Sequence, residues 1–587
     1  MSPPTVITLE NLAEQLPRWQ EDDDNHLYAV VDMGSNGIRF SITSLEPPTT
    51  RLLVPVYSTR AAISLFDALT PSPDGPIFPQ ETIEDVSSTL ARFRQLAIQH
   101  DVPQSNILVL ATEAMRRAAN AEEMLAAIAA TTEGLQVKLL DPAVETLFGA
   151  VMGSRSGLIN VKGGALFLDL GGGSVQMTWV DTDADEYAIE AADAGESLPY
   201  GAAKLTRILE EEPPEVQDRE IEKLNDGIKR IYSNLCSRFS ALQAIRDAYE
   251  QGEEASVNVF MCGGGFRGYG SMLMHNEKVS PYPISTTHAY SVTGDFFSRT
   301  EKMRRVNEEY DGKIFGMSKR RRRQFPAIAT VVEAFLAAVP NIGRVTFCGG
   351  SNRQGALMMT LPPPVRESDP LDVLCEIEQD ERQLFEATQE LLSSAMPKQL
   401  TSSTSLPTIF TLGLGPLLVC EIWNRTGHDA STNSAFALRT ATIRDSDCPG
   451  LSHLARAILG LCTCARWGCR TSPADDQLFE GLRSIADSYH EMASFWAIYI
   501  GAVSSTIASL FAVMPDEATQ LKDTIRFTTR VISRDKKRDK VVLDIGISSD
   551  SFKGIDTEKL AADFESIMSK QGDKWAPRIL VDISVLP

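Results

Sequence analysis

The chain has 587 residues, of which 43% are hydrophobic and 23% charged, values typical of a globular protein with a sizeable core and not of a disordered one. Its 56 basic and 78 acidic residues give a net charge of −22, which argues against a general nucleic-acid or acidic-membrane binder, because phosphate contacts need clustered Lys and Arg. Nine scattered cysteines, and a start without a basic and apolar leader, indicate a reducing compartment, so we expect a cytoplasmic protein.

The first 162 residues predict a polar tail and then an α/β lobe. Residues 1–25 look like the tail, and 26–162 are expected to form lobe I. This lobe starts with two apolar strands, LYAVVDM and RFSITSL. A helix follows, because apolar residues recur on one face at helical spacing. These are Val86, Leu90, Phe93, Leu96 and Ala97.

Residues 163–360 predict a second α/β lobe. GALFLDLGG and VQMTWVDT form another pair of strands, and a long helix is expected from about Leu224 to Tyr249. VNVFMCGGG and RVTFCGG are two further buried strands that each end in glycines. Alternating strands and helices are typical of α/β lobes.

A proline-rich stretch, 361–370, separates these lobes from the rest of the chain. Residues 371–515 are expected to be mainly helical, and 516–587 to form a small, separate α/β module. The stretch 492–514 carries no charge and is nearly long enough to span a bilayer. Its serines and its acidic flanks favour a buried helix, so no membrane association is expected.

Two glycine-rich turns repeat the same pattern, one in each lobe. Asp32 and Asp169 each end a buried strand, and a glycine turn and a second strand follow. An Asp at a strand end offers a carboxylate to a metal or water, and glycines let backbone N–H groups approach a phosphate. We therefore expect the turns to face each other across a phosphate-binding cleft. The candidate phosphate ligands are Gly34, Ser35, Asn36, Gly37, Gly171, Gly172, Gly173 and Ser174.

The turns and the segments around them resemble the exopolyphosphatase/guanosine-pentaphosphate phosphatase family, within the actin, Hsp70 and sugar-kinase superfamily. The resemblance implies an actin-like two-lobed fold and hydrolysis of a terminal phosphoanhydride of polyphosphate or guanosine pentaphosphate. Within the family, the chain is most similar to fungal members that regulate signalling from mitochondria to the nucleus. The similar stretches are 111–124, 141–153, 168–176, 262–272, 316–329 and 348–355.

The resemblance also implies roles for particular residues. Glu145 matches the catalytic glutamate that positions and deprotonates water. Asp169, with Asp32 facing it, would hold a metal ion, expected to be Mg²⁺. Arg116 matches an arginine that reaches a phosphate. Arg39 follows the first turn and is either a further phosphate ligand or a surface strand residue.

One departure from the family pattern divides the functional hypotheses. The family usually has Glu two residues after the serine of the second turn, and this chain has Gln176. Near Arg353, the usual Glu is likewise Gln354. The chain is therefore either a magnesium-dependent phosphatase or a nucleotide- or polyphosphate-binding sensor that a regulatory protein partner reads. A sugar kinase is less favoured, and the family suggests a homodimer formed through the C-terminal region.

A compact basic run, residues 319–323, stands out in this acidic protein. A solvated loop is the favoured interpretation. A guide for a polyanion and a nuclear address are the alternatives.

Overall fold

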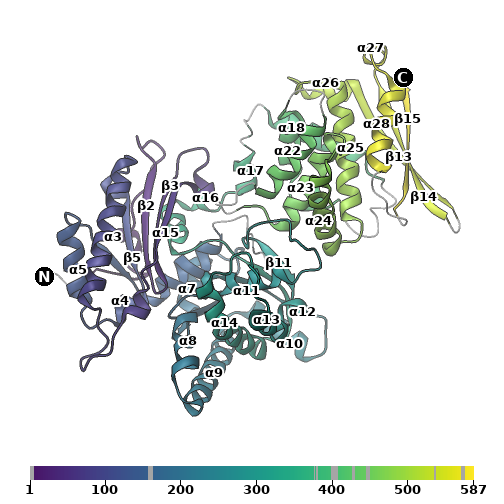
Figure 1. The fold of residues 1–587 in the computed structure, drawn as a ribbon. Helices are drawn as coiled ribbons and strands as arrows, with labels where there is room; N and C mark the ends of the chain where they lie inside the picture. Colours follow the sequence, from purple (N-terminus) through teal and green to yellow (C-terminus); the bar gives the residue numbers. More distant parts are fainter. Residues whose placement is uncertain are drawn as a thin grey trace. The chain divides into compact units, whose positions relative to one another are not determined.

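The computed structural model divides into two compact units (Figure 1). The first comprises chiefly residues 1–277 and 286–370, and the second chiefly 278–285, 371–444 and 451–587. The residues that the structure describes are 5–155, 161, 163–375, 377, 381–397, 407–425, 430–443, 450–534, 537–569 and 576–586.

The first unit contains two six-stranded sheets built on one plan. The first sheet has the order β1–β6–β5–β2–β3–β4, and the second β11–β12–β10–β7–β8–β9. In each, an antiparallel meander (β2–β3–β4 or β7–β8–β9) is extended by parallel strands, β5 and β6 or β10 and β12. This duplication is the actin-like fold expected from the sequence. The strands are β1 (Val6–Ile7), β2 (Leu27–Gly34), β3 (Gly37–Ser44), β4 (Val54–Ala61), β5 (Ile107–Ala111), β6 (Val137–Leu140), β7 (Ala165–Leu170), β8 (Val175–Val180), β9 (Glu196–Leu198), β10 (Val257–Cys262), β11 (Tyr290–Thr293) and β12 (Ile342–Phe347).

Apolar alternation along β2 explains how the first sheet is buried on both faces. Val31 and Met33 join the core on one side, and Tyr28 and Val30 the core on the other. The helix predicted to follow the first strands of lobe I is α3, and Phe93 on it stacks on Phe40 with ring centroids 4.9 Å apart. The lobe I helices are α1 (Leu12–Gln15), η1 (Thr50–Leu52), α2 (Leu65–Ala68), α3 (Gln80–Gln99), η2 (Gln104–Asn106), α4 (Glu113–Arg117), α5 (Ala121–Thr131) and α6 (Pro142–Thr146).

A π-helix, η3 (Leu147–Gly153), continues directly from α6 and lies in a core shared by both sheets. It packs closely on α15 (Asn352–Thr360), because a Cβ on Gly355 would lie 1.9 Å from the carbonyl oxygen of Phe148. π-Helical turns are rare and are frequent at functional sites. Here the π-helix follows the residue proposed as the catalytic glutamate.

The structure differs from the predicted polar tail at residues 1–25. β1 pairs in parallel with β6, and Ile7, Leu12 and Leu16 are buried in the core. A few apolar residues in a polar stretch are enough to add an edge strand, because the sheet supplies backbone partners. The N-terminal segment from residue 5 is therefore part of lobe I.

The long helix predicted over 224–249 is two helices, because Phe239 adopts an extended backbone between them. The basic run 319–323 starts a helix, α14, so the solvated-loop interpretation is wrong. The lobe II helices are α7 (Tyr187–Ala194), α8 (Ala202–Glu211), α9 (Pro214–Arg238), α10 (Ser240–Glu250), α11 (Gly263–His275), α12 (Gly294–Phe297), α13 (Thr300–Glu309), α14 (Lys319–Ala338) and α15, followed by the short α16 (Pro363–Arg366).

The second unit joins the expected helical region to the expected C-terminal module. Phe564 of the module packs edge-on against Tyr499 of α25, with ring centroids 5.8 Å apart, and Thr529 donates to the carbonyl of Met396. The predicted separate module is thus part of one compact unit. The elements are α17 (Pro370–Leu374), α18 (Arg382–Ser394), α20 (Thr408–Thr411), α21 (Gly415–Trp423), α22 (Ala430–Ile443), α23 (His453–Arg466), α24 (Pro473–Tyr489), α25 (Ala493–Leu510), α26 (Ala518–Thr524), β13 (Ile525–Arg534), β14 (Lys537–Ile547), α27 (Ser549–Phe552), α28 (Thr557–Ser569) and β15 (Arg578–Val585).

In the part of the chain that the structure describes, one helix, α25, has the length and composition to cross a membrane. Of its 18-residue window, 78% is buried inside the protein. The prediction of a buried helix over this charge-free stretch is confirmed.

Candidate functional site

The two glycine turns occupy equivalent places in the two sheets and meet. One joins β2 to β3, and the other joins β7 to β8. A Cβ on Gly172 would lie 2.8 Å from the Asn36 side chain and 3.0 Å from the Cβ of Ser35, so the second turn rests against the first. The strand register is equivalent too. Asp32 lies opposite Arg39, and Asp169 lies opposite Gln176.

A cleft of about 100 Å³ opens between the turns. At about 10–15 Å³ per water-sized probe, it has room for several waters or for a small anionic group. Every residue proposed from the sequence as a site residue lines it, except Arg116. The lining residues are Asp32, Gly34, Ser35, Asn36, Gly37, Arg39, Thr112, Glu145, Asp169, Gly171, Gly172, Gly173, Ser174, Gln176, Gly263, Gly264, Arg267, Gly350, Ser351 and Asn352.

Glu145 lies in α6, which starts at Asp141, whose carboxylate accepts from the amide of Ala143. Arg116 is within 2.8 Å of the Glu145 carboxylate and also donates to the carbonyl of Leu140. Burial raises the pKa of Glu145 to about 7, against the opposing effect of Arg116. Glu145 can therefore exchange a proton near neutral pH, as a general base must. Arg116 orients this carboxylate and does not line the cleft.

Asp32, which is buried, and Asp169, which is partly buried, face the cleft from the two lobes. Burial raises the pKa of Asp169 to about 6, Arg267 lowers it, and the Asp32 charge raises it. Burial likewise raises the pKa of Asp32, which Arg39 and Arg353 lower. Each carboxylate thus raises the cost of ionising the other, which is the condition that a cation between them would relieve.

The oxygen set suits a magnesium ion. Asp32 Oδ1 and Asn352 Oδ1 are buried without a hydrogen-bond partner, and a Cβ on Gly149 would lie 3.0 Å from Asn352 Oδ1 and 2.5 Å from Asp169 Oδ2. Mg²⁺ takes one or two carboxylates together with waters and substrate phosphates. Among the described residues, no group of three His, Cys, Asp or Glu side chains is gathered as a metal site, so the protein ligands would be few.

Several arginines surround the cleft with few acidic partners. Burial and repulsion from Arg39 lower the pKa values of Arg267 and Arg353 to about 10. The same two causes lower the pKa of Arg321. Guanidinium groups that repel one another in a buried place favour a bound anion. Arg39 is therefore a cleft residue, which the sequence alone left open.

The sequence reasoning missed Arg267 and Asn352 as site residues. Arg267 donates to the carbonyls of Cys348 and Gly350, and so ties together the two strand ends that carry the lobe II glycines. The available signal was the pair of buried strands that each end in Cys-Gly-Gly. These two motifs indicated that the strand ends belong to lobe II. They did not indicate which side chains after each motif point into the cleft.

Gln176 is buried, and its amide donates to the hydroxyl of Ser174 at 2.9 Å. It faces Asp169 across the β7–β8 pair, at the position equivalent to Arg39 in lobe I. The second turn therefore offers one carboxylate and one neutral amide where the family pattern has two carboxylates. A cation held here would meet one negative charge fewer.

The first turn of α8 holds the second glycine turn in place. The amides of Ala202 and Ala203 donate to the carbonyls of Gly171 and Gly172 at 3.0 and 2.9 Å. A Cβ on Gly201 would lie 2.3 Å from the backbone of Gly172, so this approach requires glycine. With its carbonyls engaged by α8, the turn presents its other face to the cleft.

Two glycine turns on duplicated sheets, with acidic and basic side chains between them, define an actin-like phosphate-binding protein. The chain belongs to the Ppx/GppA phosphatase family, whose model matches residues 48–363. The model of the RTG2 C-terminal domain matches residues 369–575. The chain is 30% identical over 500 residues to retrograde regulation protein 2 of Saccharomyces cerevisiae, covering 83% of this chain and 81% of the relative.

Solved structures of the phosphatase family match part of the chain at low identity. The Ppx/GppA phosphatase of Aquifex aeolicus is 19% identical, covers 57% of this chain and 99% of that one, and has a TM-score of 0.41. An exopolyphosphatase of Cytophaga hutchinsonii is 18% identical, covers 57% and 97%, and has a TM-score of 0.42.

Proposed function

We propose that the chain is a phosphate- or nucleotide-binding regulator of retrograde signalling, whose bound state is read by a protein partner. The observation that carries the proposal is that both glycine turns are complete, whereas the position beside them where the family pattern has a second carboxylate is occupied by the neutral Gln176. The turns, Arg267 and Asp169 provide what binding a phosphate chain needs. Gln176 removes a charge that hydrolysis would use. The name of the yeast relative supports the regulatory role.

The cleft would bind a phosphate chain through the backbone amides of both turns and the guanidinium groups around Arg39. Asp32, Asp169 and Asn352 would hold Mg²⁺, which when bound supplies positive charge to the phosphoryl oxygens. Closing the two lobes over the ligand changes the outer surface of the first unit. Closure of two domains around a ligand is a common form of conformational switch.

A second candidate function is a slow exopolyphosphatase or guanosine-pentaphosphate phosphatase. The partly buried Glu145, with a pKa of about 7 and an orienting Arg116, favours it. In this reaction Glu145 would accept a proton from the attacking water while the turns hold the departing chain. The two candidates share the binding step and differ in the rate of the next one.

Calorimetric titration with ATP, GTP, guanosine pentaphosphate and tripolyphosphate, each with magnesium, tests the proposal. We expect at least one of these ligands to bind. Hydrolysis, measured as phosphate release, should be far slower than dissociation of the intact ligand. Asp169→Ala should abolish binding, and Asp141→Asn, which keeps the α6 cap, is the matched control. No binding by any of the four would contradict the proposal, whereas rapid turnover would favour the phosphatase.

A further inference from the structure

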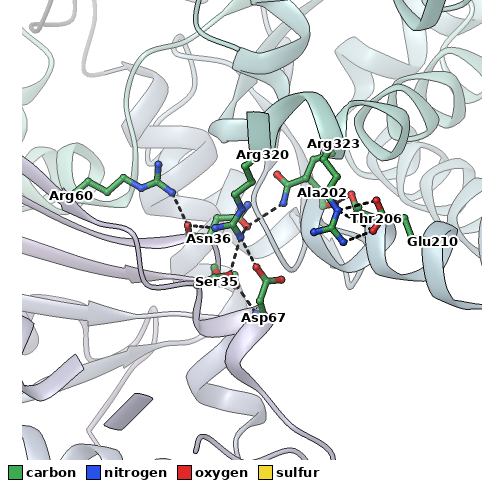
Figure 2. A network of polar contacts seen from close by, with 11 residues as sticks. Ser35, Asn36, Arg60, Asp67, Ala202, Thr206, Glu210, Arg320 and Arg323 are labelled. Atoms are coloured by element: carbon green, nitrogen blue, oxygen red, sulfur yellow. Dashed lines mark hydrogen bonds and ion pairs between the residues drawn. The ribbon is translucent and has the colours of Figure 1, made fainter. Parts of the chain in front are cut away.

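Arg320 reaches from lobe II to the first glycine turn. It lies in the first turn of α14, and its guanidinium donates to Asn36 Oδ1 at 2.6 Å, Ser64 Oγ at 2.8 Å and Asp67 Oδ2 at 2.9 Å (Figure 2). A fourth hydrogen bond, at 3.2 Å, goes to the carbonyl of Asn36. Asn36 lines the cleft. This contact between the lobes therefore ends on a residue of the ligand site.

Helix α14 is also linked, through α8, to the second glycine turn. Arg323, one turn further along α14, pairs with Glu210 of α8, with Nε 2.9 Å from Oε1 (Figure 2). The opposite end of α8 carries Ala202, whose amide donates to the second turn, at Gly171. Both glycine turns are thus linked through α8 and α14 as well as through the cleft.

Electrostatic repulsion across the lobes opposes this link. Arg39 and Arg60 belong to lobe I, and Arg267 and Arg321 belong to lobe II. Arg39 lowers the pKa values of both lobe II arginines, and the pKa of Arg60 is lowered by burial, by Arg39 and by Arg320. Bringing the lobes together therefore brings like charges together. An anion between them would turn that repulsion into attraction.

We propose that Arg320 is a latch between the lobes that engages Asn36 and Asp67 when an anion occupies the cleft. The inference rests on the proposed function and adds its regulation. Without an anion, guanidinium repulsion holds the latch partly open. A bound phosphate chain neutralises the repulsion, so Arg320 settles on its four acceptors and orders α2, at Ser64 and Asp67. Binding of the ligand in the cleft thereby changes the order of α2, a segment outside the cleft.

Hydrogen exchange of the full-length chain, with and without magnesium tripolyphosphate, tests the latch. The reporter is the segment 64–68, where the amide of Phe66 donates to the carbonyl of Ser35. Arg320→Gln and Asp67→Asn each remove one side of the ion pair. Lys319→Gln is the matched control, because Lys319 is an exposed neighbour in the same basic run.

In wild type and in Lys319→Gln, tripolyphosphate should slow exchange at 64–68 by about tenfold, the value of one strong charged hydrogen bond. In Arg320→Gln and Asp67→Asn that slowing should be lost, with tripolyphosphate binding weakened by about tenfold. Equal slowing and equal affinity in Arg320→Gln and Lys319→Gln would overturn the latch.

Failure of the proposed function is distinguishable. If wild type binds no tripolyphosphate, ligand-free exchange still decides the latch. Because the latch is only partly open without an anion, Arg320 still makes its contacts part of the time, so exchange at 64–68 should be faster in Arg320→Gln than in Lys319→Gln, and this result supports the latch. Identical exchange in these two variants overturns it.

Discussion

Gln176→Glu is the most informative single change in the cleft. It places a second carboxylate opposite Asp169, at a cross-strand position whose Cβ atoms are typically about 5 Å apart. With an effective dielectric constant of about 20, two charges at that distance repel by about 3 kcal/mol, which is about two pKa units. The pKa of Asp169 is already about 6. At pH 7 without metal, the pair should therefore keep one proton.

A divalent cation should reverse this effect. Magnesium binding to the variant should release about one proton, which titration calorimetry in buffers of different ionisation enthalpy measures directly. Thermal unfolding should show a stabilisation by magnesium that exceeds that of wild type by up to about 3 kcal/mol, the repulsion relieved. Any phosphate release should rise by about tenfold or more, because the added charge holds the cation that stabilises the transferring group.

Gln354→Glu is the matched control, because it restores the other family glutamate at a residue that does not line the cleft. Its side chain accepts from the Ser351 hydroxyl, and a glutamate can keep that contact. The control should respond to magnesium as wild type does. Equal magnesium responses in wild type, Gln176→Glu and Gln354→Glu would refute the inference that Gln176 removes a negative charge from a cation site.

Four further outcomes are expected. Asp169→Ala should abolish calorimetric binding of magnesium tripolyphosphate while far-ultraviolet circular dichroism stays unchanged; retained affinity would remove Asp169 from the site. Gly172→Val should also abolish binding, because the added side chain would push Asn36 and Ser35 away, and Gly554→Val, at an open position without a left-handed backbone, should bind normally. Any phosphate release should increase with pH and level off above about pH 7, because Glu145 must lose its proton to act as a base. Because burial raises the pKa of Glu145, its neutral form contributes stability that is present below about pH 4.5 and is lost as the pH rises to about 7. The free energy of unfolding in urea should therefore fall less over this pH range in Glu145→Gln than in wild type. The same pH dependence in both proteins would contradict the raised pKa.

The features that could be predicted best from the sequence are those that depend on local sequence patterns. Two Asp-x-Gly turns between apolar strands indicated the paired sheets, and the alternation of Tyr28, Val30 and Val31 accounts for the buried strand between two cores. Periodic apolar residues likewise predicted α3. The actin-like fold follows from such features because each lobe repeats one plan.

What the sequence could not predict depends on distant partners. The N-terminal strand forms because β6 has an open edge, which no local pattern in residues 1–25 reveals. Arg320 belongs to a basic run that is typical of a solvated segment, yet it meets Asn36 and Asp67 from another lobe. Which arginines turn into the cleft is decided by how the lobes pack.

The most direct test of the account compares binding with turnover in Glu145→Gln. Affinity for magnesium tripolyphosphate, measured by calorimetry, should be within a few-fold of wild type, because a general base need not hold the ligand. Phosphate release, measured on the same samples, should be slow in wild type and absent in the variant. No binding by wild type would contradict the claim that the cleft binds a phosphate chain. Loss of affinity in Glu145→Gln would contradict the separation of binding from catalysis on which signalling by the bound state rests.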